Sequence, residues 1–246
     1  MVSDKIKIRF LENSLLINNE IFVLGDIHIG FEEHISTSGL LRIQMKDIFN
    51  DLKDIFKKLE KENIKLKKII ILGDLKHEFG GISESEWRDV LKFLDYLGKK
   101  TKEIILIKGN HDNIIGPIAK KRKVKLKNYY KYKDICFIHG NKEYKGCLDS
   151  KILIMGHLHP SVTLSDNYKK ERYKCFLKGK WKKKEVYILP SFSSISFGYD
   201  ISEMCDKDKK GFLIIPHKKI KNFKVIIYNK KEDKEYNFGK LGKIKN

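Results

Sequence analysis

The stretch IILIKGNHD, residues 104–112, joins an apolar, strand-like run to the polar segment Gly109-Asn110-His111-Asp112. Four other apolar runs of the chain end in the same way, in residues that can bind metal. In chain order, the five segments are Asp26-Ile27-His28, Gly73-Asp74, Gly109-Asn110-His111-Asp112, His139-Gly140 and Gly156-His157-Leu158-His159. The carboxyl ends of buried parallel strands meet at one edge of an α/β sheet, where binding sites form. The pattern therefore predicts that the five segments share one site.

The first half of the chain, up to about residue 110, alternates strand-like runs with helix-period segments, which is typical of βαβ units. The strand-like runs before the five segments are Ile21 to Leu24, Ile69 to Leu72, Ile104 to Ile107, Ile135 to Ile138 and Ile152 to Met155. Between Arg42 and Asn63, apolar residues recur every three or four positions, which predicts an amphipathic helix. Ser83 and Glu86 form a capping-box pattern, so we expect a second helix from there to Gly98.

After Pro117 the pattern changes to short strands separated by charged turns. The expected strands are Tyr129 to Tyr132, Ile135 to Ile138, Ile152 to Met155, Val186 to Leu189, Phe212 to Ile215 and Phe223 to Tyr228. They predict a second sheet packed on the first. We expect the lysine-rich tail from about residue 230 to be a frayed or edge segment.

The length of 246 residues and an apolar content of 41% predict a single domain spanning residues 1–246. The chain has no apolar run long enough to cross a membrane, and residues 1–5 lack the apolar core of a signal peptide. We therefore expect a soluble, cytoplasmic protein without a membrane partner. The cysteines have no CxxC spacing, so we expect them to be reduced, with Cys136 in the core. They are Cys136, Cys147, Cys175 and Cys205.

The net charge of +20 is large for this length. Clustered basic residues attract polyanions, because they release counterions from phosphate backbones. Nearly all of the basic residues are lysine, however, so an AT-rich genome or a highly charged hyperthermophile protein would give the same composition. The charge fits a nucleic-acid partner without requiring one.

In Asp26-Ile27-His28, two side chains at a strand end can reach the same ion, one through a carboxylate oxygen and one through an imidazole nitrogen. Gly25 before them lets the backbone turn tightly. Asp74 follows a second strand, and its two carboxylate oxygens can bridge two cations about 3.5–4 Å apart, as in two-metal catalysis. We therefore interpret Asp74 as the bridging ligand.

The later segments add an amide and three imidazoles to the set of candidate ligands. These are Asn110, His139, His157 and His159. Mixed nitrogen and oxygen ligands suit Mn, Fe, Zn, Co or Ni better than Ca or Mg alone. Any one of these motifs occurs often in proteins that bind no metal. Five in order behind apolar strands indicate a two-metal phosphoesterase.

The adjacent residues His111 and Asp112 predict a proton-transfer pair. In such a pair the carboxylate orients the imidazole and favours its charged form. The charged imidazole is an acid that can protonate the leaving group.

In this order, the segments resemble the motifs of the calcineurin-like metallophosphoesterase superfamily, whose pattern is DxH, GDxxD, GNHD or GNHE, a lone H, and GHxH. The resemblance covers residues from about Ile21 to Pro160. It implies a first metal bound by Asp26, His28, Asp74 and His159, and a second bound by Asp74, Asn110, His139 and His157. It also implies that His111 is the catalytic acid, oriented by Asp112.

The resemblance implies the fold of this superfamily, an α/β four-layer αββα sandwich of two mixed β-sheets flanked by helices. The implied reaction is in-line attack on phosphorus by a hydroxide that bridges two metals, which lower its pKa and neutralise the phosphate oxygens. The second motif departs from the pattern, because His77 stands where many members carry Asp. That position is not usually a ligand, so we expect only the surroundings of the ligands to change.

Within the superfamily, the chain looks most like the archaeal and bacterial branch related to the nuclease subunits Mre11 and SbcD. The stretch from Gly30 to Arg42 and the segment Leu189-Pro190-Ser191-Phe192 are similar to that branch. Some of the residues after His159 must finish the second sheet, so we expect little room for the capping domain that such nucleases carry.

Two basic stretches contain interleaved aromatic residues: Lys120 to Lys133 (KKRKVKLKNYYKYK) and Tyr168 to Lys184 (YKKERYKCFLKGKWKKK). Such platforms bind single-stranded nucleic acid, with about 1–3 kcal/mol per stacked base. Two solvated hairpins whose aromatic residues cover the core would show the same pattern. Arg42 could likewise hold a substrate phosphate or only cap a helix. These alternatives stay open.

From the sequence we expect a metal-dependent phosphodiesterase with two divalent ions, preferably Mn, that acts on DNA or RNA. One alternative is a phosphatase or phosphodiesterase for nucleotides or other small phosphoesters. A second alternative is a non-enzymatic scaffold with the same fold. A scaffold would be expected to lose ligands, and here all seven candidates and His111 are present.

Overall fold

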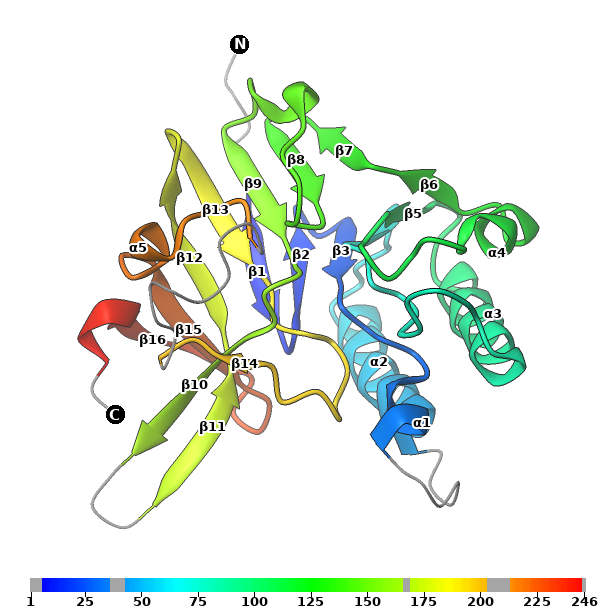
Figure 1. Cartoon of the computed structure of the whole chain (residues 1–246), viewed down its shortest axis with the longest axis horizontal. Helices are drawn as coiled ribbons and strands as arrows, with labels where there is room; N and C mark the ends of the chain where they lie inside the picture. The colour runs from blue at the N-terminus through cyan, green and yellow to red at the C-terminus, as the bar shows by residue number, and fades with distance from the viewer. Residues whose placement is uncertain (1–5, 36–42, 166–168, 203–212, 245–246) are drawn as a thin grey trace.

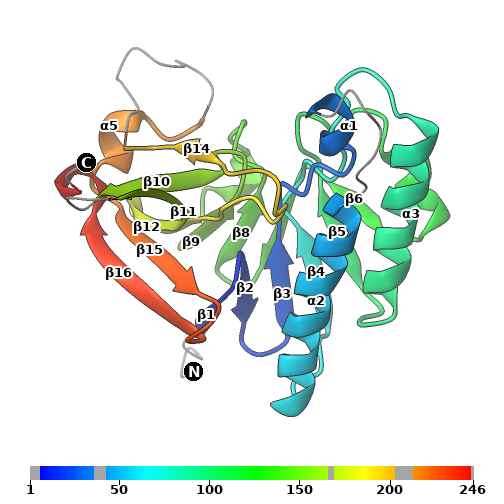
Figure 2. The same ribbon diagram turned by 90° about the horizontal axis from the view of Figure 1, so that it is seen from below.

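The computed structural model describes residues 6–35, 43–165, 169–202 and 213–244. Two mixed β-sheets pack face to face, with helices outside the first sheet and a small third sheet outside the second (Figure 1; Figure 2). Arg42, Tyr168, Cys205 and Phe212 lie outside the described residues.

The first sheet has six strands in the order β1-β2-β3-β4-β5-β6. They are β1 (Ile8–Leu11), β2 (Ser14–Ile17), β3 (Ile21–Leu24), β4 (Lys68–Ile71), β5 (Ile104–Ile107) and β6 (Lys125–Lys127). β1 to β3 pair antiparallel, and β3 to β6 pair parallel. The parallel part requires crossover connections, which agrees with the alternating sequence pattern.

Two long helices, α2 (Ile43–Lys61) and α3 (Glu84–Gly98), cover the outer face of this sheet (Figure 2). Both predicted helices are thereby confirmed. In α2 the buried positions, such as Ile48, Leu52 and Ile55, recur along one face, so most of its lysines remain in water. The short helices α1 (Phe31–Ile35) and α4 (Gly116–Lys121) complete this half. No described helix is long and apolar enough to cross a membrane.

The capping box at the start of α3 forms only in part. The Ser83 side chain accepts the backbone N–H of Glu86, as a capping box requires. The buried Glu86 carboxylate accepts the backbone N–H groups of His77 and Glu78, at 2.7 and 2.9 Å. The start of this helix therefore holds the chain segment that follows Asp74.

The second sheet has seven strands in the order β16-β15-β12-β13-β9-β8-β7. They are β7 (Tyr129–Tyr132), β8 (Ile135–Ile138), β9 (Ile152–Met155), β12 (Phe176–Trp181), β13 (Lys184–Ile188), β15 (Lys224–Asn229) and β16 (Lys234–Lys240). The second sheet predicted from the sequence is confirmed, although residues 213–215 form bends instead of the expected strand. The lysine-rich tail contains β16, an edge strand whose residues are all exposed.

A small third sheet, of β10 (Pro160–Ser165), β11 (Lys170–Lys174) and β14 (Tyr199–Asp200), covers the outer face of the second sheet together with α5 (His217–Ile220) (Figure 2). The predicted α/β architecture of two packed mixed sheets is confirmed. Its outermost layer on this side contains strands and one short helix, where the sequence analysis expected flanking helices. The reason is visible in the sequence, because this half has no long amphipathic helical segment.

The core between the two large sheets is apolar. Val23, Ile70 and Ile105 of the first sheet are buried in it with Phe137 and Ile154 of the second. Strands β3, β5 and β8 are buried along their whole length. Burial on both faces explains why these strands are continuous apolar runs and do not alternate.

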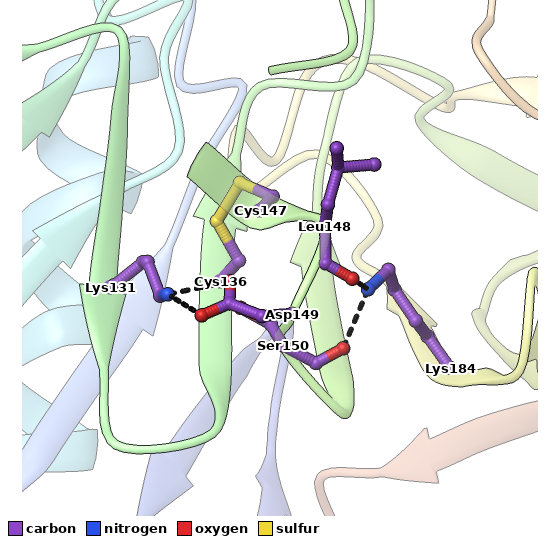
Figure 3. Close-up of a disulfide and its surroundings, with 7 residues drawn as sticks. All are labelled: Lys131, Cys136, Cys147, Leu148, Asp149, Ser150 and Lys184. Atoms are coloured by element: carbon purple, nitrogen blue, oxygen red, sulfur yellow. Dashed lines mark hydrogen bonds and ion pairs between the residues drawn. A yellow bond between two sulfur atoms is a disulfide. The ribbon is translucent and has the colours of Figure 1, made fainter. Parts of the chain in front are cut away.

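Cys136 in β8 and Cys147 in the 3-10 helix η1 (Lys145–Cys147) form a disulfide, with a Cα–Cα distance of 5.6 Å (Figure 3). The expectation that all cysteines are reduced is therefore wrong for this pair. Spacing rules do not detect it, because the turn after β8 brings together residues 11 positions apart. Cys136 is buried in the core as expected, and Cys175 is a buried free thiol.

Two lysines fix the loop that follows this disulfide (Figure 3). Lys184 Nζ donates to the carbonyl oxygens of Leu148 and Ser150, both at 2.6 Å. Lys131 pairs with Asp149 at 2.7 Å. These bonds tie the loop to β13 and β7, the neighbouring strands.

Candidate metal centre

The five polar segments converge at one edge of the molecule, beyond the carboxyl ends of five strands. β3, β4 and β5 of the first sheet and β8 and β9 of the second lead into them. Because the sheets pack face to face, their strand ends meet, and all seven predicted ligands lie together. These are Asp26, His28, Asp74, Asn110, His139, His157 and His159.

Asp26, His28, Asp74 and His159 form a first group, in which one ligand atom of each residue lies within 4.8 Å of the others. His28 Nε2 is 3.2 Å from His159 Nε2 and 3.7 Å from Asp74 Oδ2. His159 Nε2 is 3.2 Å from Asp26 Oδ1. This group has the same members as the set that the resemblance implies for one metal.

Asp74, His139 and His157 form a second group within the same limit of 4.8 Å. His139 Nε2 lies 3.3 Å from Asp74 Oδ2 and 3.0 Å from His157 Nδ1. Asn110 joins this group, because its Oδ1 lies 2.9 Å from the same nitrogen. The members again match the set implied for the other metal.

Asp74 belongs to both groups through a single oxygen. Oδ2 faces both His28 and His139, whereas Oδ1 accepts the backbone N–H of His111 at 2.9 Å. From the sequence, the two oxygens of this carboxylate are expected to bridge two cations. In the structure one oxygen faces both groups, and the other holds the backbone of the GNHD segment.

The hydrogen bond of His139 to the backbone fixes which nitrogen faces the cluster. Its Nδ1 lies 2.8 Å from the carbonyl oxygen of Leu72, and because a carbonyl only accepts, Nδ1 carries the proton. In the neutral ring, the lone pair of Nε2 then points toward Asp74 and Asn110. Metal-binding histidines are commonly oriented by such a bond.

Burial and neighbouring charges together shift the pKa values of the cluster residues in opposite directions. Desolvation, together with the nearby His159, lowers the pKa of His28 to about 3, so its ring is neutral and offers a lone pair. Burial alone would lower the pKa of His139, but its hydrogen bond to Asp74 and the charges of Asp74 and Asp26 raise it to about 9. The same contacts keep the pKa of Asp74 below its usual range although the carboxylate is buried.

Asp26 shows most directly that the cluster fits a cation. Its side chain is fully buried, and Oδ2 accepts the backbone N–H of His157 at 2.9 Å. Oδ1 faces His159 and has no hydrogen-bond partner within the described part of the chain. A buried carboxylate oxygen without a donor is costly unless a cation satisfies it.

Five of the seven residues have a left-handed backbone conformation. The φ angles are 53° at Asp26, 48° at His28, 47° at Asp74, 68° at His157 and 47° at His159. Residues other than glycine adopt this conformation at a cost of about 1 kcal/mol or more, and such residues cluster at functional sites. The sequence gives no sign of this feature, because it shows spacing and not backbone angles.

Two glycines allow the carboxylates to lie against the backbone. A Cβ atom at Gly109 would be 2.1 Å from Asp74 Oδ1, and one at Gly156 would be 2.3 Å from Asp26 Oδ2. Gly25, which the sequence analysis assigned to a tight turn, instead permits close packing, because its Cβ would be 2.8 Å from that of Leu72. Gly25, Gly109 and Gly156 are therefore needed for space.

The predicted pair of His111 and Asp112 does not form. Asp112 is fully buried, and its two oxygens accept the backbone N–H groups of Leu75 and Gly109, each at 3.0 Å. His111 Nδ1 instead lies 2.5 Å from the carbonyl oxygen of His77. Adjacent residues point in different directions here, so the carboxylate fixes the loops and the carbonyl of His77 orients the imidazole.

Two residues near His111 were not identified as part of the site. His77 Nδ1 lies 3.3 Å from His28 Nδ1, so the residue that departs from the family motif directly contacts a predicted ligand. The ring of Phe79 lies 3.9 Å from that of His111 and is 53% exposed. For Phe79, the available sequence signal was an aromatic residue two positions after His77, in the polar segment that follows Asp74.

A buried network of hydrogen bonds holds the backbone of the first motif, Asp26-Ile27-His28. Gln44 Nε2 donates to the carbonyl of His28 at 2.8 Å, and Ser191 Oγ donates to the carbonyl of Asp26 at 2.6 Å. Lys174 Nζ donates to the carbonyl of Ser191 at 2.9 Å. Burial lowers the pKa of Lys174 to about 8. The segment around Ser191, noted for its resemblance, therefore holds the loop that carries Asp26.

A cavity of about 280 Å³, the metal pocket, opens onto both groups. It is lined by candidate ligands and His111, and by Ser196, Gly198 and Tyr199 from a later segment. Phe197, between Ser196 and Gly198 in the sequence, is 70% exposed. The lining of the metal pocket is therefore mostly polar and ionisable.

Comparisons with known proteins agree with this geometry. The sequence model described as calcineurin-like phosphoesterase matches residues 20–228. A search of curated proteins found no match. Among solved structures, the nuclease MPE of Pseudomonas putida is similar with a TM-score of 0.60 and 14% identity, over 91% of this chain and 96% of that one.

Two further structures are more distant. Yfce, a phosphoesterase from E. coli, has a TM-score of 0.37 and 11% identity, over 87% of this chain and 95% of its own. Vps29 of Entamoeba histolytica in complex with Zn has a TM-score of 0.36 and 16% identity, over 88% of this chain and 91% of its own. The likeness to the nuclease concerns the fold, and the family follows from the sequence model, which spans most of the chain and all five motifs. The chain belongs to the calcineurin-like phosphoesterase family and is a hydrolase of phosphoester bonds with a His and Asp cluster suited to divalent metal.

Proposed function

We propose that this protein is a phosphodiesterase with two divalent metal ions that acts on DNA or RNA. The observation that carries the proposal is the position of Asp74, whose Oδ2 faces both ligand groups at the floor of the metal pocket. A shared carboxylate is the usual link between two ions in sites that hydrolyse phosphoesters.

Each group has the donors for one ion. Asp26, His28, Asp74 and His159 would hold the first, and Asp74, Asn110, His139 and His157 the second. Mn²⁺ is our first choice, because imidazole, amide and carboxylate ligands together suit it. When bound, the two cations supply a water of lowered pKa and offset the charge of the phosphate.

His111 is our candidate for the proton donor to the leaving group. Its Nδ1 donates to the carbonyl of His77, so Nε2 is the nitrogen that can hold or release a proton at the metal pocket. The ring of Phe79 packs against it and limits its rotation. Asp112 acts indirectly, because it holds the backbone of Leu75 and Gly109 on either side of the site.

Nucleic acid is favoured as the substrate by charge and by exposed aromatic rings. The chain carries a net charge of +20, which attracts polyanions. Phe79 is exposed and its ring packs against His111, which lines the metal pocket, so a planar base beside the phosphodiester could stack on it. Phe197, which follows the lining residue Ser196 in the sequence, is also exposed. Neither feature is needed for a small phosphate monoester.

The test is cleavage of end-labelled single- and double-stranded DNA and RNA by the purified protein with Mn²⁺. His111→Ala and the small ester bis-p-nitrophenyl phosphate are assayed beside it. We expect cleavage of at least one nucleic acid by the parent protein and strong loss of that cleavage in the variant. Hydrolysis of the small ester with every nucleic acid left intact would contradict the proposed substrate.

A second candidate function is hydrolysis of nucleotides or other small phosphoesters. The size of the metal pocket favours it, because about 280 Å³ lies near the lower limit for small-molecule sites. This alternative predicts activity on small esters, little affinity for nucleic acid and weak dependence of binding on salt.

A further inference from the structure

A second and larger cavity, of about 550 Å³, lies between the β10–β11 hairpin and strands β15 and β16. We call it the hairpin groove. In Figure 2 the hairpin lies over the second sheet on the side away from the long helices. The residues that matter for its chemistry are Lys169, Glu171, Tyr173, Lys231, Tyr236 and Phe238.

Three exposed aromatic residues line this groove. Tyr173 is 37% exposed, Tyr236 36% and Phe238 44%. Among the described residues, only three other aromatic side chains are comparably exposed, and one of these, Phe79, packs against His111 of the metal pocket. Exposed aromatic residues gathered in one concave surface indicate a binding site and not a core.

The charges around these rings favour an anionic ligand. Lys231 lines the groove and forms no ion pair with any described residue. The acidic residue of the groove, Glu171, is compensated by an ion pair with Lys169 and a hydrogen bond from Tyr173. Lys234 lies over the ring of Tyr236, 5.3 Å from its centroid. The hydroxyl of Tyr236 donates to Glu232, as that of Tyr173 does to Glu171. A ligand would therefore meet planar rings flanked by ammonium groups, with these two carboxylates each held by a tyrosine hydroxyl.

One strand connects the groove with the metal pocket. β10 begins at Pro160, directly after the candidate ligand His159, and ends at Ser165 in the groove (Figure 1). At about 3.3 Å per residue, this strand spans roughly 17 Å. A chain molecule that leaves the metal pocket along β10 would reach the groove.

We propose that the hairpin groove binds single-stranded nucleic acid, with bases stacked on Tyr173, Tyr236 and Phe238 and phosphates near Lys169 and Lys231. Stacking on aromatic side chains beside lysines is how single strands are held without sequence preference. This inference rests on the proposed function, because it explains how a nucleic-acid substrate is held. It also distinguishes the two basic stretches, since only the second, through β11, lines the groove.

The experiment measures binding of a fluorescently labelled single-stranded DNA by anisotropy. It uses metal-loaded His111→Ala protein, and a gel verifies that the strand stays intact. In this background we expect Y173A/Y236A/F238A to bind at least tenfold more weakly, since each stacking contact changes affinity about fivefold or more. Lys231→Glu, on which no packing depends, should also weaken binding several-fold and serves if the triple variant folds poorly.

The matched control is Tyr129→Ala. Tyr129 is 36% exposed and lies in β7, within the other basic stretch and outside the groove. It should bind like the parent. Equal loss in Tyr129→Ala and in the groove variants, or unchanged affinity in the groove variants, would overturn the proposal.

Hydrolysis of bis-p-nitrophenyl phosphate, measured with the groove substitutions in the otherwise wild-type enzyme, separates failure of this inference from failure of the proposed function. Weaker binding of DNA with unchanged hydrolysis supports a distinct site. Hydrolysis without any binding of single strands would overturn the groove proposal and leave the metal-dependent phosphoesterase intact. The oligomeric state of the parent and of the groove variants is measured in parallel. If the parent is a dimer and a groove variant is a monomer with unchanged DNA binding, the groove binds a second copy of the chain, and the groove proposal is overturned.

Discussion

The metal pocket and the hairpin groove lie at the two ends of β10 and are built in opposite ways. At the metal pocket, charged side chains are buried, five residues have left-handed backbone angles, and carboxylates touch glycines. In the hairpin groove, regular strands display exposed aromatic and lysine side chains. The first depends on the path of the backbone and the second only on side chains. We therefore expect the pocket to tolerate almost no substitution and the groove to tolerate most.

The largest expected effect is that of Asp74→Ala. It removes the one carboxylate that faces both ligand groups, so we expect loss of bound metal and at least a thousandfold loss of phosphodiester hydrolysis. Elemental analysis and hydrolysis of bis-p-nitrophenyl phosphate measure both. Asp149→Ala, which removes a 75% exposed carboxylate paired with Lys131, is the control and should change neither. Full metal loading in Asp74→Ala would contradict the bridging assignment.

His111→Ala should have the next largest effect on hydrolysis. Loss of a general acid costs about 10²–10⁴-fold in rate. Metal should stay bound in the two groups that share Asp74, because His111 belongs to neither of them; its own close group is that with His28 and His77. The loss should be smaller for p-nitrophenyl esters, whose leaving group is a weak base and needs little protonation. Rates on a nucleic acid and on the small ester, compared in the same preparation, measure this difference. An equal loss on both substrates would argue against a role as proton donor.

Gly109→Ala tests the dependence of the pocket on backbone space. The new Cβ would meet Asp74 Oδ1 at 2.1 Å and the Asp74 backbone nitrogen at 2.4 Å, so something must shift. We expect a stability loss of about 1–3 kcal/mol and weaker metal binding. Gly98→Ala, at the end of α3 with nothing within 4 Å, should be neutral or slightly stabilising. Denaturant unfolding of both variants measures the difference in stability. If Gly109→Ala were as stable as the parent and bound metal normally, the metal pocket would not depend on backbone space more than the groove does.

The smallest expected effect is near the groove, at Glu12, which lies 3.3 Å from Lys230. Burial raises the pKa of Glu12 to about 7, and Asp51 adds to this, while Lys230 opposes it. The folded protein therefore binds more protons than the unfolded chain between about pH 4.5 and 7, and stability falls as the pH rises through this window. Glu12→Gln should remove that slope.

The difference is measured by denaturant unfolding at about pH 5 and about pH 8. On going from about pH 5 to about pH 8, the unfolding free energy of Glu12→Gln should rise by about 1 kcal/mol relative to that of the parent. This value allows for partial exposure of the side chain. Glu235→Gln, on the exposed edge strand β16, is the control and should track the parent. Parallel pH profiles for the parent and Glu12→Gln would show that the carboxyl titrates normally.

The sequence predicted which residues gather at one edge of the molecule, because their positions follow from strand order. Continuous apolar runs identify β3, β5 and β8 as buried strands. When the two sheets pack face to face, the carboxyl ends of these strands lie at the same edge of the molecule. The amphipathic pattern of α2 likewise fixed a helix that the structure contains with nearly the same bounds. These features depend on local composition and a simple packing rule.

The features that sequence reasoning missed depend on exact paths of the chain. Asp112 follows His111 directly, yet it bonds the backbone of Leu75, because a turn separates the directions of adjacent side chains. The partner of Cys136 lies across a loop whose course no spacing rule describes. The hairpin groove joins strands β11 and β16, which are far apart in the sequence.

The most direct test of the central claim is a titration of metal-free protein with Mn²⁺, in which bound metal and hydrolysis of bis-p-nitrophenyl phosphate are measured at each step. The account predicts that activity rises with occupancy and saturates when two ions are bound per chain. It also predicts that Asp74→Ala remains inactive throughout. Full activity with one ion, or hydrolysis that does not depend on added metal, would contradict a two-metal centre built around Asp74.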